Sequence, residues 1–231
     1  MRASRQRPGL RSAALAALCA LAAACAQAPP RDVPPAATQA PAGQPHGAGQ
    51  AGRPAAPPPH PEAVSYALDP VHTRIAIAID HAGFSRAIAT VSGTTGTLQL
   101  APGSWEGARV DVEIPLDRLD FGDAAWNRAV AARGLLDTGQ HPVATFHSTR
   151  VEPVDAGRAR IHGLLTLRGN TREVVLDAVR NAERRYPLPP FRRAVGFSAT
   201  ATLSRADFGS TAWDSMVGDA VEVRIELEAS R

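Results

Sequence analysis

The chain of 231 residues lacks lysine and has almost no cysteine. All 25 of its basic residues are arginine, a bias that is typical of GC-rich genomes and to which we give no functional weight. The two cysteines, Cys19 and Cys25, both precede residue 26. The rest of the chain therefore has no thiol for a disulfide, a metal site or a nucleophile.

An apolar run long enough to span a bilayer is also lacking near the N-terminus. The stretch from Ala13 to Ala24 is too short for a mature membrane helix, but it follows four arginines and has the length of a signal-peptide core. We therefore expect residues 1–24 to be a signal peptide and the protein to be exported.

The segment Ala22-Ala23-Ala24-Cys25 resembles the cleavage box of bacterial lipoproteins. The resemblance implies that Cys25 is lipidated, and Ala26 after it implies sorting to the outer membrane. The box prefers Leu where Ala22 stands, so ordinary cleavage to a secreted soluble protein and an uncleaved anchor both stay open. We expect a periplasmic lipoprotein that is bound to the outer membrane through this lipid.

Residues 25–62 are rich in Pro, Ala and Gly and have almost no large apolar side chains. Such a segment cannot bury enough surface to offset the entropy of ordering, so we expect a disordered tether after the lipidation site. From residue 63 onward, 19 arginines face 20 acidic residues. A domain this close to neutral is not expected to bind nucleic acid.

Residues 63–231 form one domain in which apolar and charged residues alternate along several segments. Val221, Val223, Ile225 and Leu227 alternate with charges, and the same pattern occurs in 75–79 and 110–114. Because successive side chains of a strand point to opposite faces, these strands share an enclosed apolar interior. The predicted strands span 64–68, 73–81, 86–100, 108–115, 143–151, 158–168, 173–182, 194–204 and 221–229.

One segment, Asp123 to Leu136, has apolar residues at three- and four-residue spacing and predicts a helix inserted between strands. Asp123 is its expected N-cap. The domain is therefore expected to be all-β, an antiparallel barrel or sandwich with one helix.

Four motifs, in order along the domain, resemble the YceI-like family. They are Tyr66-Ala67-Leu68-Asp69-Pro70-Val71-His72-Thr73 with His81 after it, Gln140-His141-Pro142-Val143-Ala144-Thr145-Phe146-His147-Ser148, Gly163-Leu164-Leu165-Thr166-Leu167-Arg168-Gly169, and Ser204-Arg205-Ala206-Asp207-Phe208-Gly209. The resemblance implies an eight-stranded, lipocalin-like antiparallel barrel that holds a polyisoprenoid or related amphiphile. It also implies that homodimers occur among relatives. Family members often carry Arg-Asp-x-His-Leu where this chain has Trp126 to Val130, so a head-group role of that segment does not transfer.

The residue pattern and the resemblance together give a candidate site in the barrel lumen. The expected lumen residues are Ile75, Ile77, Ile79, Val110, Val112, Ile114, Phe146, Phe197, Ala199, Ala201, Val223 and Ile225. The candidates for contact with a polar or anionic head group at the mouth are His72, Arg118 and Arg168. Eight strands lie at the size where a barrel is either filled by side chains or holds one small ligand, so a filled core stays open.

No motif of a hydrolase elbow, a phosphate loop or a zinc protease occurs, and the histidine spacing is not that of a metal site. We therefore expect a carrier with no enzymatic activity, no metal and no cofactor, whose ligand is a polyisoprenoid, an isoprenoid quinone or a fatty-acid derivative. The alternative is an envelope structural or stress protein with a filled barrel.

Overall fold

The structure, a computed structural model, describes residues 58–231. The expected signal peptide 1–24, the lipidation site Cys25 and most of the expected tether lie outside these residues and stay predictions. Within residues 58–231, no helix has the length and apolar character needed to cross a bilayer.

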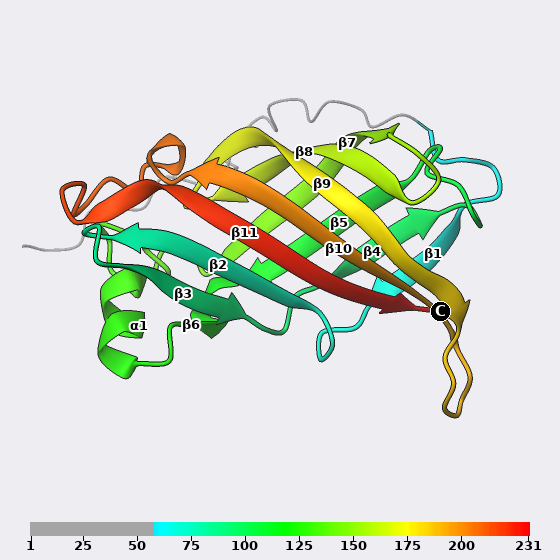
Figure 1. Cartoon of the computed structure of the whole chain (residues 1–231), viewed down its shortest axis with the longest axis horizontal. Helices are drawn as coiled ribbons and strands as arrows, with labels where there is room; N and C mark the ends of the chain where they lie inside the picture. Colours follow the sequence, from blue (N-terminus) through cyan, green and yellow to red (C-terminus); the bar gives the residue numbers. More distant parts are fainter. Residues whose placement is uncertain (1–57) are drawn as a thin grey trace, which may run out of the picture. The chain divides into compact units, whose positions relative to one another are not determined.

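The described chain is almost entirely β-strand, with one α-helix (Figure 1). The strands are β1 (Val64–Leu68), β2 (Arg74–His81), β3 (Ser85–Val91), β4 (Thr95–Leu100), β5 (Arg109–Pro115), β6 (Leu119–Asp120), β7 (Val143–Pro153), β8 (Arg158–Leu167), β9 (Asn170–Arg185), β10 (Arg193–Ser204) and β11 (Val217–Ser230). The helix is α1 (Ala124–Ala131), and two short 3-10 helices span Leu116–Arg118 and Ala206–Phe208.

The strands close into an antiparallel barrel. The ring runs β1-β4-β5-β7-β8-β9-β10-β11 and returns to β1 through the pairs Ala67↔Ser230 and Leu68↔Ala229. Three of the barrel strands consist of two segments each. The first is β1 followed by β2, both paired with β11; the second is β3 followed by β4; and the third is β5 followed by β6. The expected eight-stranded barrel with one inserted helix is therefore confirmed, with three of its strands each divided into two segments.

The three interruptions fall next to one another on the barrel wall. The carboxylate of Asp69 accepts hydrogen bonds from the amides of Val71 and His72, at 2.8 and 3.2 Å, which bends the chain after β1. Gly93, with a φ of 77°, separates β3 from β4, and its amide bonds the carbonyl of Pro70. The continuous strand predicted over 86–100 is therefore wrong at this bend.

A close approach of two backbones follows the second interruption. A Cβ on Gly96 would lie 2.1 Å from the carbonyl oxygen of Asp111 on β5, so only glycine fits there. The backbones of β4 and β5 can therefore come close together where the barrel changes from its β1-β4-β5 part to its β2-β3-β6 part.

The helix α1 begins where the sequence predicts. Asp123 is its N-cap and accepts hydrogen bonds from the amides of Ala125 and Trp126, at 2.8 and 2.9 Å. The helix ends at Ala131, five residues before the predicted Leu136. After it the chain turns, and Gly134 packs against Ala212 and bonds its amide, so a longer helix would lose this contact.

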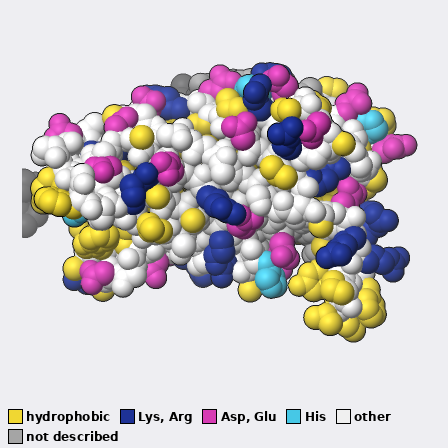
Figure 2. All heavy atoms as spheres, in the orientation of Figure 1, with side chains coloured by type: hydrophobic (Ala, Val, Ile, Leu, Met, Phe, Trp, Pro, Cys, Tyr) yellow, Lys and Arg dark blue, Asp and Glu magenta, His cyan; other side chains and the backbone are white. Residues whose placement is uncertain are grey.

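The outer faces of the strands carry charges of both signs, interspersed with polar residues (Figure 2). On β11 and β2, for example, Glu222, Arg224 and Arg74 point outward between inward apolar residues. The ion pair Arg86–Glu222, at 2.9 Å, joins β3 to β11 across β2 on this surface. Exposed pairs of this kind contribute at most about 1 kcal/mol each.

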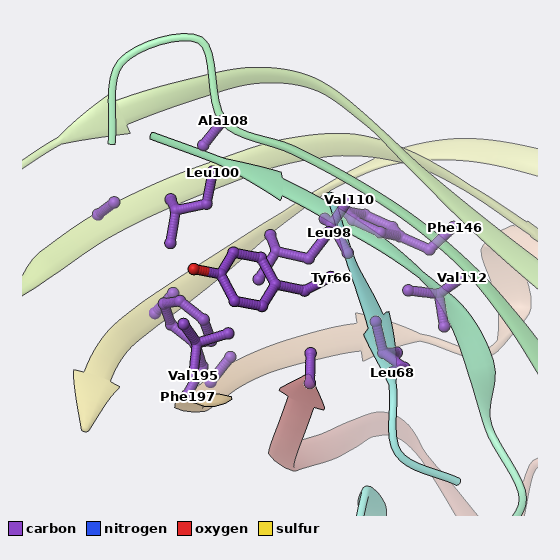
Figure 3. Packing of buried hydrophobic residues seen from close by; sticks show 14 of the residues in the cluster. Tyr66, Leu68, Leu98, Leu100, Ala108, Val110, Val112, Phe146, Val195 and Phe197 are labelled. Atoms are coloured by element: carbon purple, nitrogen blue, oxygen red, sulfur yellow. The ribbon is translucent and has the colours of Figure 1, made fainter. Parts of the chain in front are cut away.

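One half of the barrel interior is filled by large side chains (Figure 3). Tyr66 and Leu100 are each only 1% exposed, and the rings of Trp105 and Phe197 pack with centroids 5.5 Å apart. The other members of this packed cluster include Leu68, Leu98, Ala108, Val110, Val112, Ala178, Val195, Ala199 and Ala229. We call this part, at the β1 and β4 end, the filled half.

Candidate ligand cavity

The opposite half of the barrel, at the β2, β3 and β6 end, encloses a cavity of about 470 Å³. Its wall includes Ile75, Ile77, Ile79, Ala87, Val91, Ile114, Leu116, Phe146, Leu165, Leu167, Val174, Leu176, Ala201, Leu203, Phe208, Val221, Val223 and Ile225. Within the described chain, five of the lining residues are polar or charged: Asp80, His81, Arg168, Arg205 and Ser210. We call this part the hollow half. Small-molecule sites commonly have volumes of about 300–1,000 Å³ and mostly apolar walls.

The alternation in β2 and β11 builds one side of this cavity. The two strands pair in the register Ile75↔Ile225, Ile77↔Val223 and Ile79↔Val221, so their apolar residues lie side by side on the inner face. Ile77, Val223 and Ile225 are only half-buried although they point inward. Their remaining exposure is to the cavity, whose wall they form.

The wall of the hollow half is not closed by strands alone. The β5–β7 ladder ends at Pro115↔Val143, and in the described chain β6 pairs only with β3. The gap is covered by α1 and the turn after it, which place Trp126, Ala129, Val130, Leu135 and Leu136 on the cavity. No residue of α1 is fully buried, so the helix is a lightly packed cover over a seam.

Contacts of Trp126 and Asn127 hold the helix α1 in place over this gap. Its indole packs on the ring of His81, with centroids 5.4 Å apart, and edge-on against Phe121, at 5.9 Å. Asn127 of the same helix donates to the carboxylate of Asp120 and accepts from the amide of Phe121, both at 2.8 Å. The helix is thus joined to β2 and β6 by polar and aromatic contacts.

The cavity opens beside three lining residues that are also exposed to solvent. Trp126, Trp213 and Met216 are 42%, 65% and 44% exposed. They come from α1 and from the connection between β10 and β11. We call this place the mouth of the cavity.

Arg205 is a buried cation in the cavity wall. Its guanidinium donates to the carbonyls of Gly218, Ala212 and Val217, at 2.8 to 2.9 Å, and to that of Ser210. It therefore holds the β10–β11 connection around itself. Hydrogen bonds from the Ser204 hydroxyl and the Ala206 amide lower the pKa of Asp219, and the charge of Arg205 lowers it further. No carboxylate of the described chain forms a salt bridge with Arg205.

Arg168 is the second cation on the wall and lies in the turn between β8 and β9. Its guanidinium donates to the carbonyls of Gly209 and Arg133, so it ties the β10–β11 connection to the turn after α1. Carbonyl oxygens accept hydrogen bonds from both guanidiniums without neutralising their charge, and the buried Nε of Arg168 has no hydrogen-bond partner in the described chain. Within residues 58–231, neither Arg168 nor Arg205 is paired with a carboxylate at salt-bridge distance.

Phe146, Leu165 and Phe208 belong both to the cavity wall and to the packed cluster, so they form the floor between the two halves. The edge of the Phe146 ring lies against Gly163 of β8, where a Cβ would be 2.3 Å from the ring. Glycine in the predicted Gly-x-Leu-Thr segment thus makes room for the aromatic ring that closes the cavity.

The structure places the predicted lumen residues in two groups. On the cavity wall lie Ile75, Ile77, Ile79, Ile114, Phe146, Ala201, Val223 and Ile225. Val110, Val112, Phe197 and Ala199 also point inward, but they are packed in the filled half and do not line the cavity. Their side chains meet Tyr66, Trp105 and Leu98 there, which is why no space remains at these positions.

The predicted head-group residues also separate. Arg168 lies on the cavity wall, whereas His72 and Arg118 do not. His72 is exposed and its Nδ1 lies 2.7 Å from Asp69 at the first strand interruption. Arg118 is exposed as well and covers Gly93 at the second.

Sequence reasoning missed Arg205, the residues of α1 and the pair Leu135 and Leu136. The helix residues could have been found from their apolar spacing, since a helix of this amphipathic kind must cover something. Arg205 lies in the motif from Ser204 to Gly209 that resembles the family, but nothing in the neighbouring sequence indicates that its guanidinium is buried among carbonyl groups.

Two further histidines have protein partners that explain them. His147 Nδ1 lies 2.6 Å from Asp111, and His162 contacts Arg150 and Glu152. In the described part of the chain, no three His, Cys, Asp or Glu side chains come together as a metal site would require. The described histidines therefore do not form a recognisable metal centre.

Comparison with known proteins gives consistent results. A family model described as "YceI-like domain" matches residues 66–229. A UPF0312 protein of Ectopseudomonas mendocina is 30% identical over 171 residues, covering 73% of this chain and 88% of the relative. One of Pseudomonas savastanoi is 30% identical over 149 residues, covering 64% and 77%.

Solved structures share the fold at lower identity. BcnA of Burkholderia cenocepacia superposes with a TM-score of 0.63 at 18% identity, covering 70% of this chain and 99% of that one. A domain of Saccharophagus degradans, described as polyisoprenoid binding and implicated in plant cell wall breakdown, has a TM-score of 0.50 at 15% identity, covering 71% and 97%.

Proposed function

The chain belongs to the YceI-like family, and from this premise we propose that its barrel binds one long apolar amphiphile in the hollow half. The observation that carries the proposal is an apolar cavity whose only cations, Arg168 and Arg205, lack carboxylate partners in the described chain. The apolar part of the ligand lies along β2 and β11, and its polar head lies near the arginines.

The ligand class that we propose is isoprenoid-type, with an anionic head such as a phosphate. A branched apolar chain suits the Ile, Val and Leu side chains of the wall, and the description of the Saccharophagus domain names a ligand of this kind. Isoprenoid quinones and fatty-acid derivatives are the other members of the class that fit the wall. The cavity ends at Phe146, so only part of a long chain is enclosed.

The energetics favour a protein that binds and releases its ligand, as a carrier or reservoir does, over one that retains it irreversibly. Burial of each methylene from water contributes about 0.8 kcal/mol, but transfer from a bilayer to an apolar cavity contributes little, because both surroundings are apolar. The polar head therefore decides whether the ligand stays in the barrel or returns to the membrane. We further propose that the protein acts in the periplasm, tethered to the outer membrane through lipidated Cys25 and residues 26–62.

Native mass spectrometry with lipid extraction tests this function. The chain is expressed with its own N-terminal segment so that it meets envelope lipids, and a stoichiometric apolar adduct is expected. A protein that remains empty after incubation with polyprenyl phosphates and quinones would contradict the proposal and favour a structural envelope protein.

The head-group assignment has its own test in Arg168→Met. We expect the ratio of affinities for an isoprenoid phosphate and for the matching alcohol to fall roughly tenfold or more, since a hydrogen bond to a charged group contributes about 1.5–3 kcal/mol. The ratio cancels any general loosening of the mouth. Arg172→Met, an exposed arginine four residues away on β9, is the matched control and should leave the ratio unchanged.

A further inference from the structure

The connection between β9 and β10 leaves the barrel as an exposed hairpin (Figure 1). Residues 184–193 read Arg-Arg-Tyr-Pro-Leu-Pro-Pro-Phe-Arg-Arg, and all ten are exposed. The amide of Tyr186 donates to the carbonyl of Arg192 at 2.7 Å, and that of Phe191 to Leu188 at 2.9 Å. The hairpin thus has its own shape. We call residues 184–193 the finger.

The tip of the finger is apolar. Leu188, Phe191 and Tyr186 are 64%, 51% and 39% exposed, and the three other residues between Tyr186 and Phe191 are prolines. Figure 2 shows this tip as a group of hydrophobic side chains projecting from one end of the molecule, next to a group of basic ones. A contiguous apolar group that a soluble protein leaves exposed marks an interaction surface.

Four arginines, Arg184, Arg185, Arg192 and Arg193, surround the base of the tip, and no acidic residue occurs in 184–193. Within residues 58–231, none of the four forms a salt bridge. The rest of the domain is close to neutral, so this positive charge is local. Its partner should be anionic at the level of the arginines and apolar beyond them.

We propose that the finger inserts into the surface of a bilayer that contains anionic phospholipids. Leu188, Phe191 and Tyr186 enter the boundary between head groups and acyl chains, where aromatic residues are favoured. The four guanidiniums then lie at the level of the phosphates, which they bind by charge-assisted hydrogen bonds. The occupant is the lipid surface itself, not a single lipid in a pocket.

Two other partners fit the finger less well. A second copy docking finger to finger would bring four arginines against four, and like charges at close range repel. A nucleic acid would match the arginines but leave Leu188 in contact with water or phosphate. Of the three, the lipid surface presents negative charge and apolar chains in the order that the finger requires.

The position of the finger gives it a consequence for the cavity. The finger lies at the same barrel end as the start of β1, where the described chain begins. The strand register shows this through the pairs Arg193↔Arg185, Ala194↔Ser230 and Ala67↔Ser230. The mouth lies at the other end of the barrel. The finger therefore holds the filled half against the membrane and points the mouth away from it. Only this last point rests on the proposed function.

Vesicle co-sedimentation tests the finger. Every sample is the full chain with Cys25→Ser, so that no acyl anchor contributes, and the vesicles are phosphatidylcholine with or without phosphatidylglycerol. We expect binding to the anionic vesicles that weakens with salt. Each Arg→Gln change in the finger should weaken it about fivefold, and Leu188→Ser with Phe191→Ser should abolish it.

The matched control is Phe84→Ser, which removes a 91% exposed side chain in the β2–β3 turn at the other barrel end. We expect it to leave vesicle binding unchanged. Equal binding by the finger variants and the parent chain would overturn the proposal, as would a loss caused only by Phe84→Ser. A dimer of the parent chain that Leu188→Ser with Phe191→Ser dissociates would also overturn it, in favour of self-association. Ligand retention in the finger variants, measured by mass spectrometry, shows separately whether the cavity still functions.

Discussion

The filled and hollow halves of the barrel are formed by the same sheet but hold different side chains inside. In the filled half, Tyr66, Trp105 and Phe197 meet across the axis, whereas in the hollow half the inward residues are mostly Ile, Val, Leu and Ala. Large rings can reach the barrel axis and branched aliphatic side chains cannot. An eight-stranded barrel lies near the limit between filled and open, and this chain has both states in one barrel.

The comparison also separates stability from binding. A side chain in the filled half touches others on every side, so its removal leaves a void. A side chain in the hollow half already borders a void and has fewer contacts to lose. The filled half should therefore carry most of the stability, and the hollow half most of the ligand affinity.

Truncation in each half should give the largest contrast. Phe197→Ala is expected to lower the free energy of unfolding by about 3–5 kcal/mol, because it removes a packed ring beside Trp105. Ile77→Ala, on the cavity wall, should cost at most about 2 kcal/mol in the empty protein. Urea denaturation of delipidated protein measures both. Equal losses would show that the hollow half is packed in solution.

Two alanines on one face of β10 give the next test. Ala201 lines the cavity and Ala199 is packed in the filled half. Ala201→Trp should fill the cavity and reduce ligand affinity by about a hundredfold with the fold retained, as expected for losing most of the apolar burial. Ala199→Trp should instead destabilise the barrel, by about 1–3 kcal/mol or more. Ligand titration and thermal unfolding of both variants separate the outcomes. Normal ligand affinity in a folded Ala201→Trp protein would show that the ligand does not bind in the hollow half.

The floor between the halves should set how much of a chain is enclosed. Phe146→Leu shortens the side chain that ends the cavity and should admit about one more methylene. One buried methylene contributes about 0.8 kcal/mol, so the preference for a longer over a shorter isoprenoid phosphate should rise roughly fourfold. Competition binding with two chain lengths measures this ratio. An unchanged ratio would mean that the ligand ends before Phe146.

The smallest effect is expected at His72, outside both halves. Its side-chain hydrogen bond with Asp69 raises the pKa of His72 in the folded protein. A raised folded pKa contributes stability that is complete below the unfolded value, about 6.5, and is lost as the pH rises through the folded pKa. His72→Gln should therefore be slightly less stable than the parent at low pH and equal to it at high pH, with unchanged ligand binding. Denaturation curves at two pH values, with ligand titration at each, check this. A loss of ligand affinity in His72→Gln would instead support the expectation from the sequence that His72 contacts the head group.

Much of the fold could be predicted from the sequence. The alternation in 75–79 and 221–227 marks inner and outer faces directly, and the predicted strands match the observed ones closely. Asp123 as a helix cap was equally local. The bend at Gly93 was missed because strand propensity continues on both sides of it.

The division into two halves could not be predicted, because it depends on side chains that meet from different strands. Nothing in β10 itself distinguishes Ala199 from Ala201. Both pair with cavity-wall residues of β11, Ala199 with Ile225 and Ala201 with Val223. Ala199 also pairs with Ala178 of β9, in the packed cluster that holds Phe197 and Trp105, whereas the β9–β10 ladder ends before Ala201. Arg205 was missed for a similar reason, since its four carbonyl partners come from a connection with no regular pattern.

The most direct test of the account is photocrosslinking with an isoprenoid phosphate that carries a diazirine on its chain, followed by peptide mapping. We expect adducts on residues of the hollow half, on β2, on β11 before Ile225 and at the floor around Phe146 and Leu165. Adducts confined to the outer surface, or to the finger, would contradict the claim that the hollow half of the barrel is the binding site.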